Sequence, residues 1–339
     1  MTDDVQRERR LYEIRREAER TGTVSAETMA ISGSPIPQRS RSTDGYYGLP
    51  MLKAPVWTWE VPAYFFVGGT AGASAVIGAV ARRIGGDSSL VRDARWVAAV
   101  GGAASAPLLI SDLGRPERFL NMLRVFKLRS PMSVGAWTLV AFSNAAAAAA
   151  AADLIQRASR GRIAVKVIGD AAEVMAAATG LVLSTYTGVL LGATAIPVWS
   201  RNVQLLPIHF GASGVGSAAS LLELLGHRSR ALNRIAIGAA LVETAIGLGI
   251  ESHHDPEMDA LRSGSSGLLT RLAGVLSGPV PLALRVIGSR SQTARRAAAL
   301  STLVGSMLTR VGWVEAGRES ARRPAHADAS GSGHEGAGL

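Results

Sequence analysis

Eight long apolar segments, separated by short charged loops, restrict what this chain can fold into. Each carries few charges and approaches the roughly 20 residues that an α-helix needs to cross a bilayer. They lie at about residues 59–81, 94–110, 133–152, 172–196, 205–225, 235–250, 268–287 and 297–311. The seventh segment is the weakest, because charged residues and prolines interrupt it: Arg271, Pro279, Pro281 and Arg285. The sequence therefore predicts an all-α integral membrane protein, a bundle of about eight transmembrane helices.

Polar segments flank this bundle at both ends. Residues 1–45 are rich in Arg, Glu, Ser and Thr, and residues 318–339 are rich in Gly, Ser, Ala and His. Such compositions cannot bury enough apolar surface to fold, so we expect two disordered tails around a membrane domain at residues 46–317. The orientation stays open. The Lys and Arg of the short loops favour both termini outside the cytoplasm, whereas the Arg-rich N-terminal tail favours the opposite.

Composition excludes several classes of function. The chain has no cysteine, so it cannot ligate an iron–sulfur cluster in the usual way, form a disulfide or use a thiolate nucleophile. The net charge of +10 comes largely from Arg in loops and tails, where it acts as a membrane anchor and topology signal, so we expect no nucleic-acid partner. The His253, His254, Asp255 and Glu257 group is interpreted as a solvated loop, and no metal site is predicted.

A polar hinge at residues 111–119 connects the second and third spans. Asp112 and Arg115 follow an uncharged run, and charges in such a place are expensive unless they are paired or used. Gly114 and Pro116 permit a turn and then a helix start. From Phe119 onward, apolar residues recur at helical spacing, which predicts an amphipathic helix lying at the membrane surface.

The first span carries polar residues on one face. Glu60 and Tyr64 share that face with Gly68 and Gly72, whose small size lets helices pack closely in lipid. One interpretation is a polar site inside the bundle. The other, equally open, is that Glu60 lies among the lipid headgroups and that Tyr64 belongs with Trp59 to an interfacial aromatic belt.

Other polar groups fall inside or at the ends of later spans. Glu243 lies in the middle of the sixth span and shares a face with small residues, which favours a proton relay or a ligand contact over a protonated structural residue bonded to a backbone carbonyl. Tyr186 lies in the middle of the fourth span, where its hydroxyl needs a partner. Glu173 enters the same span on its first turn, where the helix dipole also favours an acid.

His209 is the only histidine within a predicted span. A b-type haem held by two histidines needs a facing pair, so we expect no haem in this chain. A hydrogen-bonded core residue is the interpretation we favour for His209, and a contact to a bound cofactor is the alternative.

These motifs together resemble the NrfD/polysulfide reductase membrane-subunit family over about residues 46–320. The motifs that carry the resemblance are Trp59-Glu60, Tyr64 to Gly69, Ser111 to Phe119, Ser130 to Trp137, Tyr186 to Leu191, Pro197 to Trp199, Leu206 to Phe210, and Arg310 with Ala316-Gly317. The resemblance implies an eight-helix subunit in a prokaryotic cytoplasmic membrane that binds menaquinone or ubiquinone. Its implied partners are a ferredoxin-like iron–sulfur subunit and a molybdopterin catalytic subunit.

The resemblance also implies roles for individual residues. Tyr64 and Tyr186 match polar positions of the quinone site, and Asp112 with Arg115 matches the hinge beside it. The family's first helix offers a His and an Asn near the quinone, whereas this chain has Glu60 to Tyr64 there, so Glu60 is our substitute for the proton-accepting group. We assign Trp59 and His209 as further cofactor contacts, and Glu243 and Glu173 to a proton pathway. The alternatives are an ion or proton transporter and a structural anchor without an active quinone site.

Overall fold

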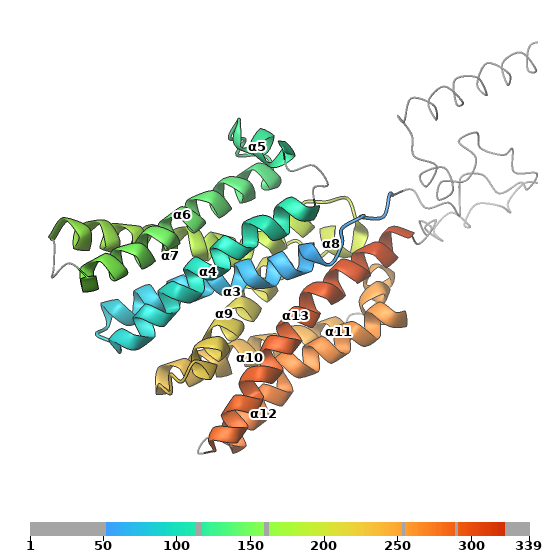
Figure 1. The fold of residues 1–339 in the computed structure, drawn as a ribbon. Coiled ribbons are helices and arrows are strands. Elements are labelled where there is room, and N and C mark those ends of the chain that lie inside the picture. The colour runs from blue at the N-terminus through green and yellow to red at the C-terminus, as the bar shows by residue number, and fades with distance from the viewer. Residues whose placement is uncertain (1–51, 113–116, 159–162, 253–254, 289–290, 323–339) are drawn as a thin grey trace, which may run out of the picture. The chain divides into compact units, whose positions relative to one another are not determined.

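Long apolar helices make up the structure, because a chain in lipid must satisfy its own backbone hydrogen bonds. The computed structural model describes residues 52–112, 117–158, 163–252, 255–288 and 291–322, all of them within one compact unit, Pro50–Arg323. The elements are shown in Figure 1. The helices with lengths and hydropathy suited to a membrane are α3 (Glu60–Arg83), α4 (Ser88–Asp112), α6 (Pro131–Ala158), α7 (Ile163–Gly192), α9 (Leu205–Leu224), α10 (Arg230–Ser252), α11 (Gly264–Ser277) continued by α12 (Pro279–Ile287), and α13 (Gln292–Arg322).

The predicted count of eight spans is confirmed among the described residues. The seventh span, which was the weakest of the predicted spans, is a broken helix. Gly278 separates α11 from α12 with φ −105° and ψ −95°, and Pro279 occupies the first turn of α12. A proline has no backbone N–H to continue the ladder, so the break falls where Pro279 and Pro281 follow one another closely. The interruption lies inside the predicted span.

Three short elements lie between the spans. They are α5 (Glu117–Leu123), α8 (Pro197–Ser200) and the 3-10 helix η1 (Pro256–Leu261). The amphipathic helix predicted after the hinge corresponds to α5, which buries Phe119 and exposes Leu120. Arg115 and the rest of the turn at 113–116 lie outside the described residues.

Helix α3 is the central element of the bundle. It packs against α4 and α7 of the N-terminal half and against α9 and α13 of the C-terminal half. The small residues on its face make this packing close. A Cβ placed on Gly72 would lie 2.3 Å from the carbonyl oxygen of Gly180 in α7, so only two glycines permit that approach. The predicted small-residue rows therefore lie at helix–helix contacts.

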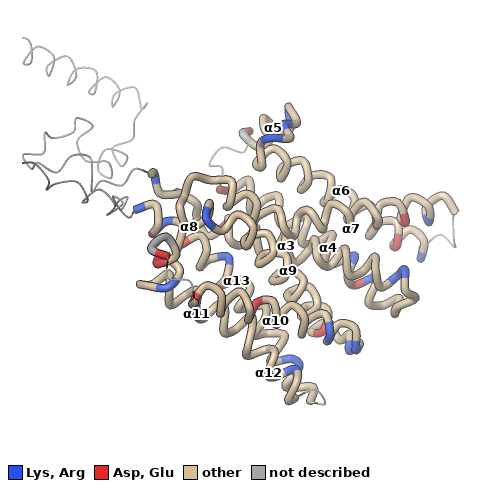
Figure 2. Tube along the Cα trace, turned by 180° about the vertical axis from the view of Figure 1, so that it is seen from behind, with Lys and Arg blue, Asp and Glu red and all other residues tan. Residues whose placement is uncertain are grey.

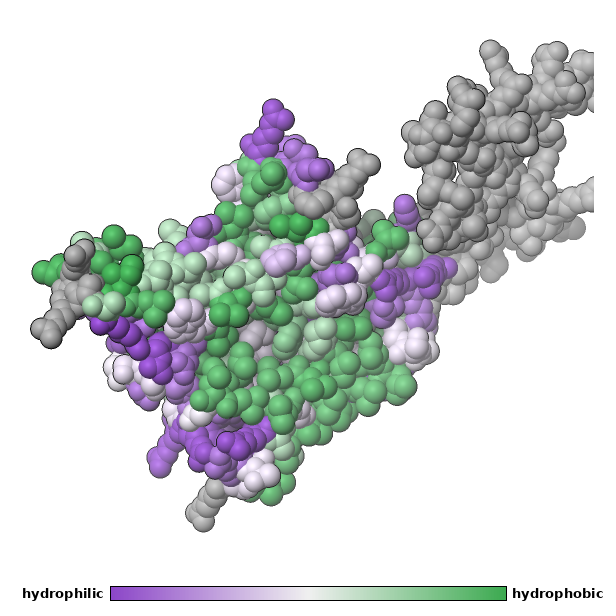
Figure 3. All heavy atoms as spheres, viewed as in Figure 1, coloured by the Kyte–Doolittle hydropathy of each residue, from purple (hydrophilic) through white to green (hydrophobic). Residues whose placement is uncertain are grey.

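The surface of the bundle has a hydrophobic face and charged ends, as expected for a membrane protein. Figure 2 shows the charged residues gathered mostly toward the two ends of the helices. Figure 3 shows a broad hydrophobic face over the C-terminal helices, bordered by hydrophilic residues. Large apolar side chains such as Leu248 of α10 and Leu268 of α11 are exposed on the bundle, which is favourable only against lipid. The protein is therefore a multi-pass membrane protein.

The C-terminal boundary differs from the predicted one. Helix α13 continues to Arg322 and buries Ser320 and Ala321, so residues 318–322 belong to the bundle and not to the predicted tail. Three of its five residues are charged, which made this stretch look like part of a polar tail, but the small residues between them, Ser320 and Ala321, pack into the bundle. The N-terminal tail, residues 1–45, lies outside the described residues.

Candidate functional site

Two predicted carboxylates meet at one end of the bundle, where α3 begins and α4 ends. The backbone N–H of Thr58 donates to Oδ1 of Asp112 at 3.1 Å. The Thr58 hydroxyl contacts the same oxygen at 3.1 Å and also contacts the carboxylate of Glu60. Asp112 and Glu60 are thus brought together around a single hydroxyl. Trp59, with 68% of its surface exposed, points away from the bundle core.

An aromatic pair closes the bundle beside these carboxylates. The ring of Trp57 stacks on Trp199 with centroids 5.3 Å apart, and it meets Phe65 edge-on at 6.3 Å. The indole N–H of the buried Trp199 donates to the carbonyl oxygen of Trp313 at 2.8 Å. Trp57, which the sequence analysis did not assign to the site, therefore makes the interior contact at this end.

Tyr64 and Tyr186 both point into the bundle below that end. Tyr64 is 1% exposed, and its hydroxyl has no hydrogen-bond partner among the described residues. Tyr186 packs against Gly135 of α6, where an added Cβ would lie 1.9 Å from the ring. The two phenols come from α3 and α7, which pack directly against each other. A buried hydroxyl without a partner is unfavourable, so Tyr64 is a group that a ligand can satisfy.

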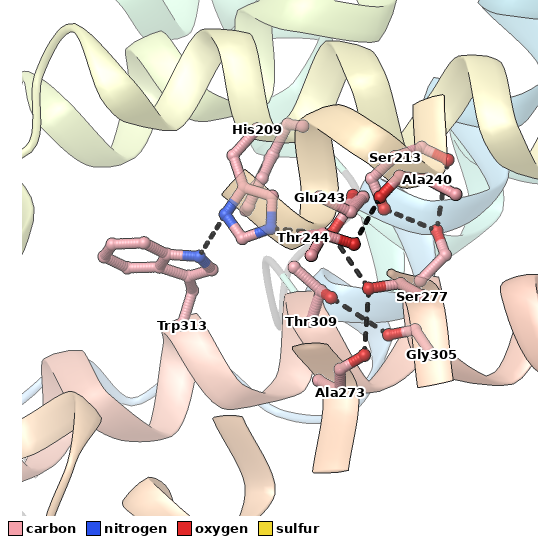
Figure 4. Close-up of polar contacts among 12 residues, drawn as sticks. His209, Ser213, Ala240, Glu243, Thr244, Ala273, Ser277, Gly305, Thr309 and Trp313 are labelled. Carbon is pink, nitrogen blue, oxygen red and sulfur yellow. Dashed lines mark hydrogen bonds and ion pairs between the residues drawn. The ribbon is translucent and has the colours of Figure 1, made fainter. Parts of the chain in front are cut away.

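A second polar cluster lies in the C-terminal half and is shown in Figure 4. His209 of α9 lies between Trp313 of α13 and Glu243 of α10. The indole N–H of Trp313 donates to Nδ1 of His209 at 3.1 Å, and Nε2 of His209 lies 3.0 Å from Oε2 of Glu243. An indole N–H can only donate, so Nδ1 must accept and Nε2 must carry the hydrogen. His209 is therefore a neutral donor to Glu243.

Glu243 has one satisfied oxygen and one free oxygen. Oε2 also accepts from the hydroxyl of Ser277, the last residue of α11, at 2.9 Å. Oε1 is buried and has no partner among the described residues. The observed partners are side chains, so the backbone-carbonyl bond considered for Glu243 is not the arrangement found. His209 is hydrogen-bonded within the core, as we favoured.

A fully buried arginine lies near this cluster. Arg310 of α13 donates to the hydroxyls of Ser213 and Ser306 and to the Phe210 carbonyl oxygen, the last at 3.2 Å. Its guanidinium also lies 5.1 Å from the centre of the Phe210 ring, in cation–π geometry. Arg310 belongs to one of the motifs that carry the family resemblance, but the sequence indicated no function for it. The structure shows that it joins α13 to α9.

Glu173 lies in a separate cluster at the opposite ends of α3 and α4. Its carboxylate contacts the guanidinium groups of Arg82 and Arg95, and Arg82 also contacts Asp170. The side chain of Glu173 is only 7% exposed. A buried carboxylate held by two arginines is stabilised as a charged group. Glu173 and Glu243 are thus bonded to different helices and do not share partners.

A cavity of about 180 Å³ opens beside Glu243 between α10, α11 and α13. Glu243, His209 and Trp313 lie on its wall. Sequence patterns predicted Glu243 and His209 as site residues, but they did not indicate Trp313 or Ser277. The Ser277-Gly278-Pro279 run inside an apolar segment was the signal for the helix break next to this cavity.

Among the residues that the structure describes, no group of three or more His, Asp or Glu side chains is placed to hold a metal ion. His253 and His254, which belong to the loop group considered in the sequence, lie outside the described residues.

Comparison with known proteins identifies a family for this chain. No curated protein matches this sequence. The family model described as "Polysulphide reductase, NrfD" matches residues 49–317, the whole bundle apart from the last turn of α13. This confirms the resemblance seen in the hinge and in the first, third, fourth and fifth spans. The chain belongs to the NrfD polysulphide reductase family of membrane subunits.

Proposed function

We propose that this chain is the quinone-reactive membrane anchor of a respiratory oxidoreductase complex in a prokaryotic cytoplasmic membrane. In that role it exchanges electrons between a bound menaquinone or ubiquinone and an iron–sulfur partner subunit. The observation that carries the proposal is the buried Tyr64 hydroxyl, which has no hydrogen-bond partner among the residues that the structure describes. Family membership makes a quinone the natural molecule to satisfy it.

The chemistry of the side chains around Tyr64 suits a quinone. A quinone carbonyl oxygen accepts hydrogen bonds, and a phenol hydroxyl donates them. The neighbouring helices contribute the fully buried apolar side chains Leu139, Phe142 and Leu183, which keep water away. A bound quinone would supply the electron-transfer chemistry, and the chain supplies binding, orientation and a dry environment.

The rim of the pocket provides groups that handle protons. Glu60 and Asp112 share the Thr58 hydroxyl at the end of the bundle, where polar loops begin. A carboxylate there can pass a proton between the pocket and water, which a buried phenol alone cannot do at neutral pH. Arg115 remains a prediction as the group that holds Asp112. Trp59 and His209 remain predictions as cofactor contacts.

Electrons must reach the pocket from outside the chain, because a sequence without cysteine cannot ligate an iron–sulfur cluster through thiolates. We infer a ferredoxin-like partner subunit, with a molybdopterin catalytic subunit beyond it. Helix α5 is a suitable docking surface, since it lies at the same end as Asp112 and exposes Leu120.

Quinol-dependent reduction of the partner's clusters tests this function in the purified complex. The Tyr64→Phe substitution removes one hydroxyl and leaves the ring, so we expect the rate to fall about tenfold, the effect of losing a hydrogen bond of roughly 1.4 kcal/mol. Thr185→Val is the matched control. It removes an exposed hydroxyl that bonds within its own helix α7, and it should leave the rate unchanged.

Unchanged rates in Tyr64→Phe, Tyr186→Phe and Asp112→Asn together would show that the site is elsewhere. If wild-type protein also failed to support quinol-dependent reduction, the chain would be a structural anchor.

A transporter is the second candidate, and one observation favours it. The α11–α12 break at Gly278 lies beside Glu243, and discontinuous helices beside buried charges are typical of transporter ion sites. Glu243 and Glu173 remain predictions as proton-pathway residues. Proton uptake by vesicles containing the chain without its partners would support transport. Glu243→Gln should abolish that uptake.

A further inference from the structure

The inner part of the cavity, around Glu243, is lined by polar groups whose hydrogens are already used within the protein, so they can only accept hydrogen bonds. Three threonines on its wall turn their hydroxyl protons into their own helices. Thr244 donates to the Ala240 carbonyl oxygen at 2.7 Å, Thr270 to Ser266 at 2.9 Å and Thr309 to Gly305 at 3.0 Å. What remains toward the cavity are oxygen lone pairs.

The inner wall repeats this pattern. The indole N–H of Trp313 is occupied by His209, and the Nε2 hydrogen of His209 is occupied by Glu243. Oε1 of Glu243 has no donor among the described residues, although Glu243 is only 2% exposed. A carboxylate oxygen buried in this way needs a donor, because leaving it without one is unfavourable. The ligand that fits must therefore bring a hydrogen-bond donor.

The outer part of the cavity is mostly apolar and opens on the outer surface of the bundle, with the charged residues Glu251 and Arg271 at its exposed edge. Leu248 of α10 and Val275 of α11 lie on its wall and are exposed on the outer surface of the bundle. The Arg271–Glu251 ion pair, 2.7 Å between Nε and Oε1, lies on the same wall and is also exposed. A molecule dissolved in the membrane can thus enter between α10 and α11 without crossing water.

The volume suits one aromatic ring. The cavity holds about 180 Å³, and an apolar cavity of about 150 Å³ is enough to take up benzene. An alkyl or isoprenoid tail would extend between α10 and α11 into the lipid. A bare metal cation fits less well, because the wall is mostly apolar and offers one free carboxylate oxygen in place of a full oxygen shell.

We propose that this cavity is a second ligand site, distinct from the Tyr64 pocket, that binds a hydroquinone through a hydroxyl group donated to Glu243. The two sites have opposite hydrogen-bonding character. Tyr64 offers a donor and suits a carbonyl oxygen, whereas Glu243 offers an acceptor and suits a hydroxyl. Glu243, at the inner end of the cavity, therefore favours the reduced, hydroxyl-bearing form of a membrane quinone. Binding at Glu243 requires no electron transfer at Tyr64, so it does not depend on the function proposed above.

The test uses a probe without redox chemistry. The intact complex in detergent is titrated with 3-fluoro-4-pentylphenol and followed by ¹⁹F NMR, and the methyl ether of the same phenol is titrated in parallel. The ether keeps the ring and the tail but has no donor. We expect the phenol to give a saturable bound signal and the ether to bind at least tenfold more weakly. Equal binding of the two would overturn the proposal.

Two substitutions locate the site. Glu243→Gln replaces the charged acceptor with a neutral one of the same size and should weaken phenol binding about tenfold. Gly247→Leu fills the cavity from α10, where an added Cβ meets no atom within 4 Å, so the helix should tolerate it while the phenol is excluded. Gly238→Leu is the matched control, since it also has free space on α10 but lies away from the cavity. If Gly247→Leu and Gly238→Leu bound the phenol equally, the cavity would not be the site.

Competition identifies the class of natural ligand. A short-tailed ubiquinol, whose head group is a single ring, should displace the fluorinated phenol, and the corresponding quinone should not. Failure of the hydroquinone to compete would overturn its assignment as the ligand. Tyr64→Phe should leave phenol binding unchanged while it slows cluster reduction, so the failure of one proposal can be told from the failure of the other.

Discussion

Tyr186 has its place in the bundle because residue 135 on the neighbouring helix has no side chain. A Cβ at Gly135 would lie 1.9 Å from Cζ and 2.0 Å from the hydroxyl oxygen of Tyr186. The glycine therefore does more than permit close helices. It fixes where a phenol of the proposed quinone pocket can lie, and it links packing directly to the site.

The Gly135→Ala substitution tests this link. We expect the ring of Tyr186 to be displaced, with a loss of about 1–3 kcal/mol in unfolding free energy from overpacking and slower quinol-dependent cluster reduction. Gly238→Ala is the control, because an added Cβ there meets no atom within 4 Å, and it should leave both properties unchanged or raise stability slightly. Thermal unfolding of the complex and the reduction rate are the measurements. Identical behaviour of the two variants would contradict the close contact.

The sequence predicts which individual polar residues are buried better than it predicts which of them contact one another. Spacing placed Tyr186 and Glu243 inside the bundle and left Tyr64 open between the interior and the membrane interface, and the structure buries all three. It could not predict that His209 donates to Glu243, because these residues are 34 positions apart on different helices. Nothing local to either residue indicates the other, since the rotation of each helix about its axis is set by packing.

Single helices show two different solutions for polar groups in lipid. Glu173 on α7 is neutralised by arginines that α3 and α4 bring to it. Glu243 on α10 has only neutral donors in contact, from α9 and α11. A buried carboxylate that is neutralised by arginines, like Glu173, typically has a structural role. A carboxylate with neutral partners beside a cavity is typical of a site that exchanges protons or binds a ligand.

The Glu173→Gln substitution distinguishes a structural role from the predicted proton-pathway role. The substitution removes the carboxylate shared by Arg82 and Arg95 but leaves each arginine one partner, Asp170 and Asp153 respectively, so we expect a loss of about 1–3 kcal/mol in stability. Glu315→Gln in the exposed Arg318–Glu315 pair of α13 should change stability by about 0–1 kcal/mol. Unfolding midpoints in detergent give the comparison. If Glu173→Gln slowed turnover but unfolded like Glu315→Gln, the proton-pathway role would be supported and the structural one contradicted.

In the molecule as a whole, α3 holds the two halves together, and Arg310 strengthens the same region. Arg310 bonds to Ser213 and Phe210 of α9 and lies against Gly69 of α3, where an added Cβ would be 3.5 Å from its Nη2. A fully buried arginine can remain in the apolar interior only because hydroxyls, a carbonyl group and an aromatic ring surround its guanidinium.

The Arg310→Lys substitution tests this arrangement. A lysine keeps the charge but cannot reach these acceptors with a planar fork or cover the Phe210 ring in the same way. We expect stability to fall by about 2–5 kcal/mol, with loosening of α9 against α13 detectable by hydrogen exchange. Arg296→Lys, on the exposed part of the same helix, is the control and should have little effect. Equal unfolding midpoints for the two variants would show that the network around Arg310 contributes little.

The sequence by itself determined the class of structure and its composition limits. A long apolar segment in lipid forms a helix because it must satisfy its own backbone hydrogen bonds, so counting such segments yields eight spans. The absence of cysteine excludes an iron–sulfur cluster held by thiolates. The tertiary structure alone decided which polar groups meet: Glu60 with Asp112 around Thr58, His209 with Glu243, and Glu173 with two arginines. Hydropathy acts on each segment separately, whereas these contacts depend on how the helices pack and rotate against one another, and that is determined by the whole bundle at once.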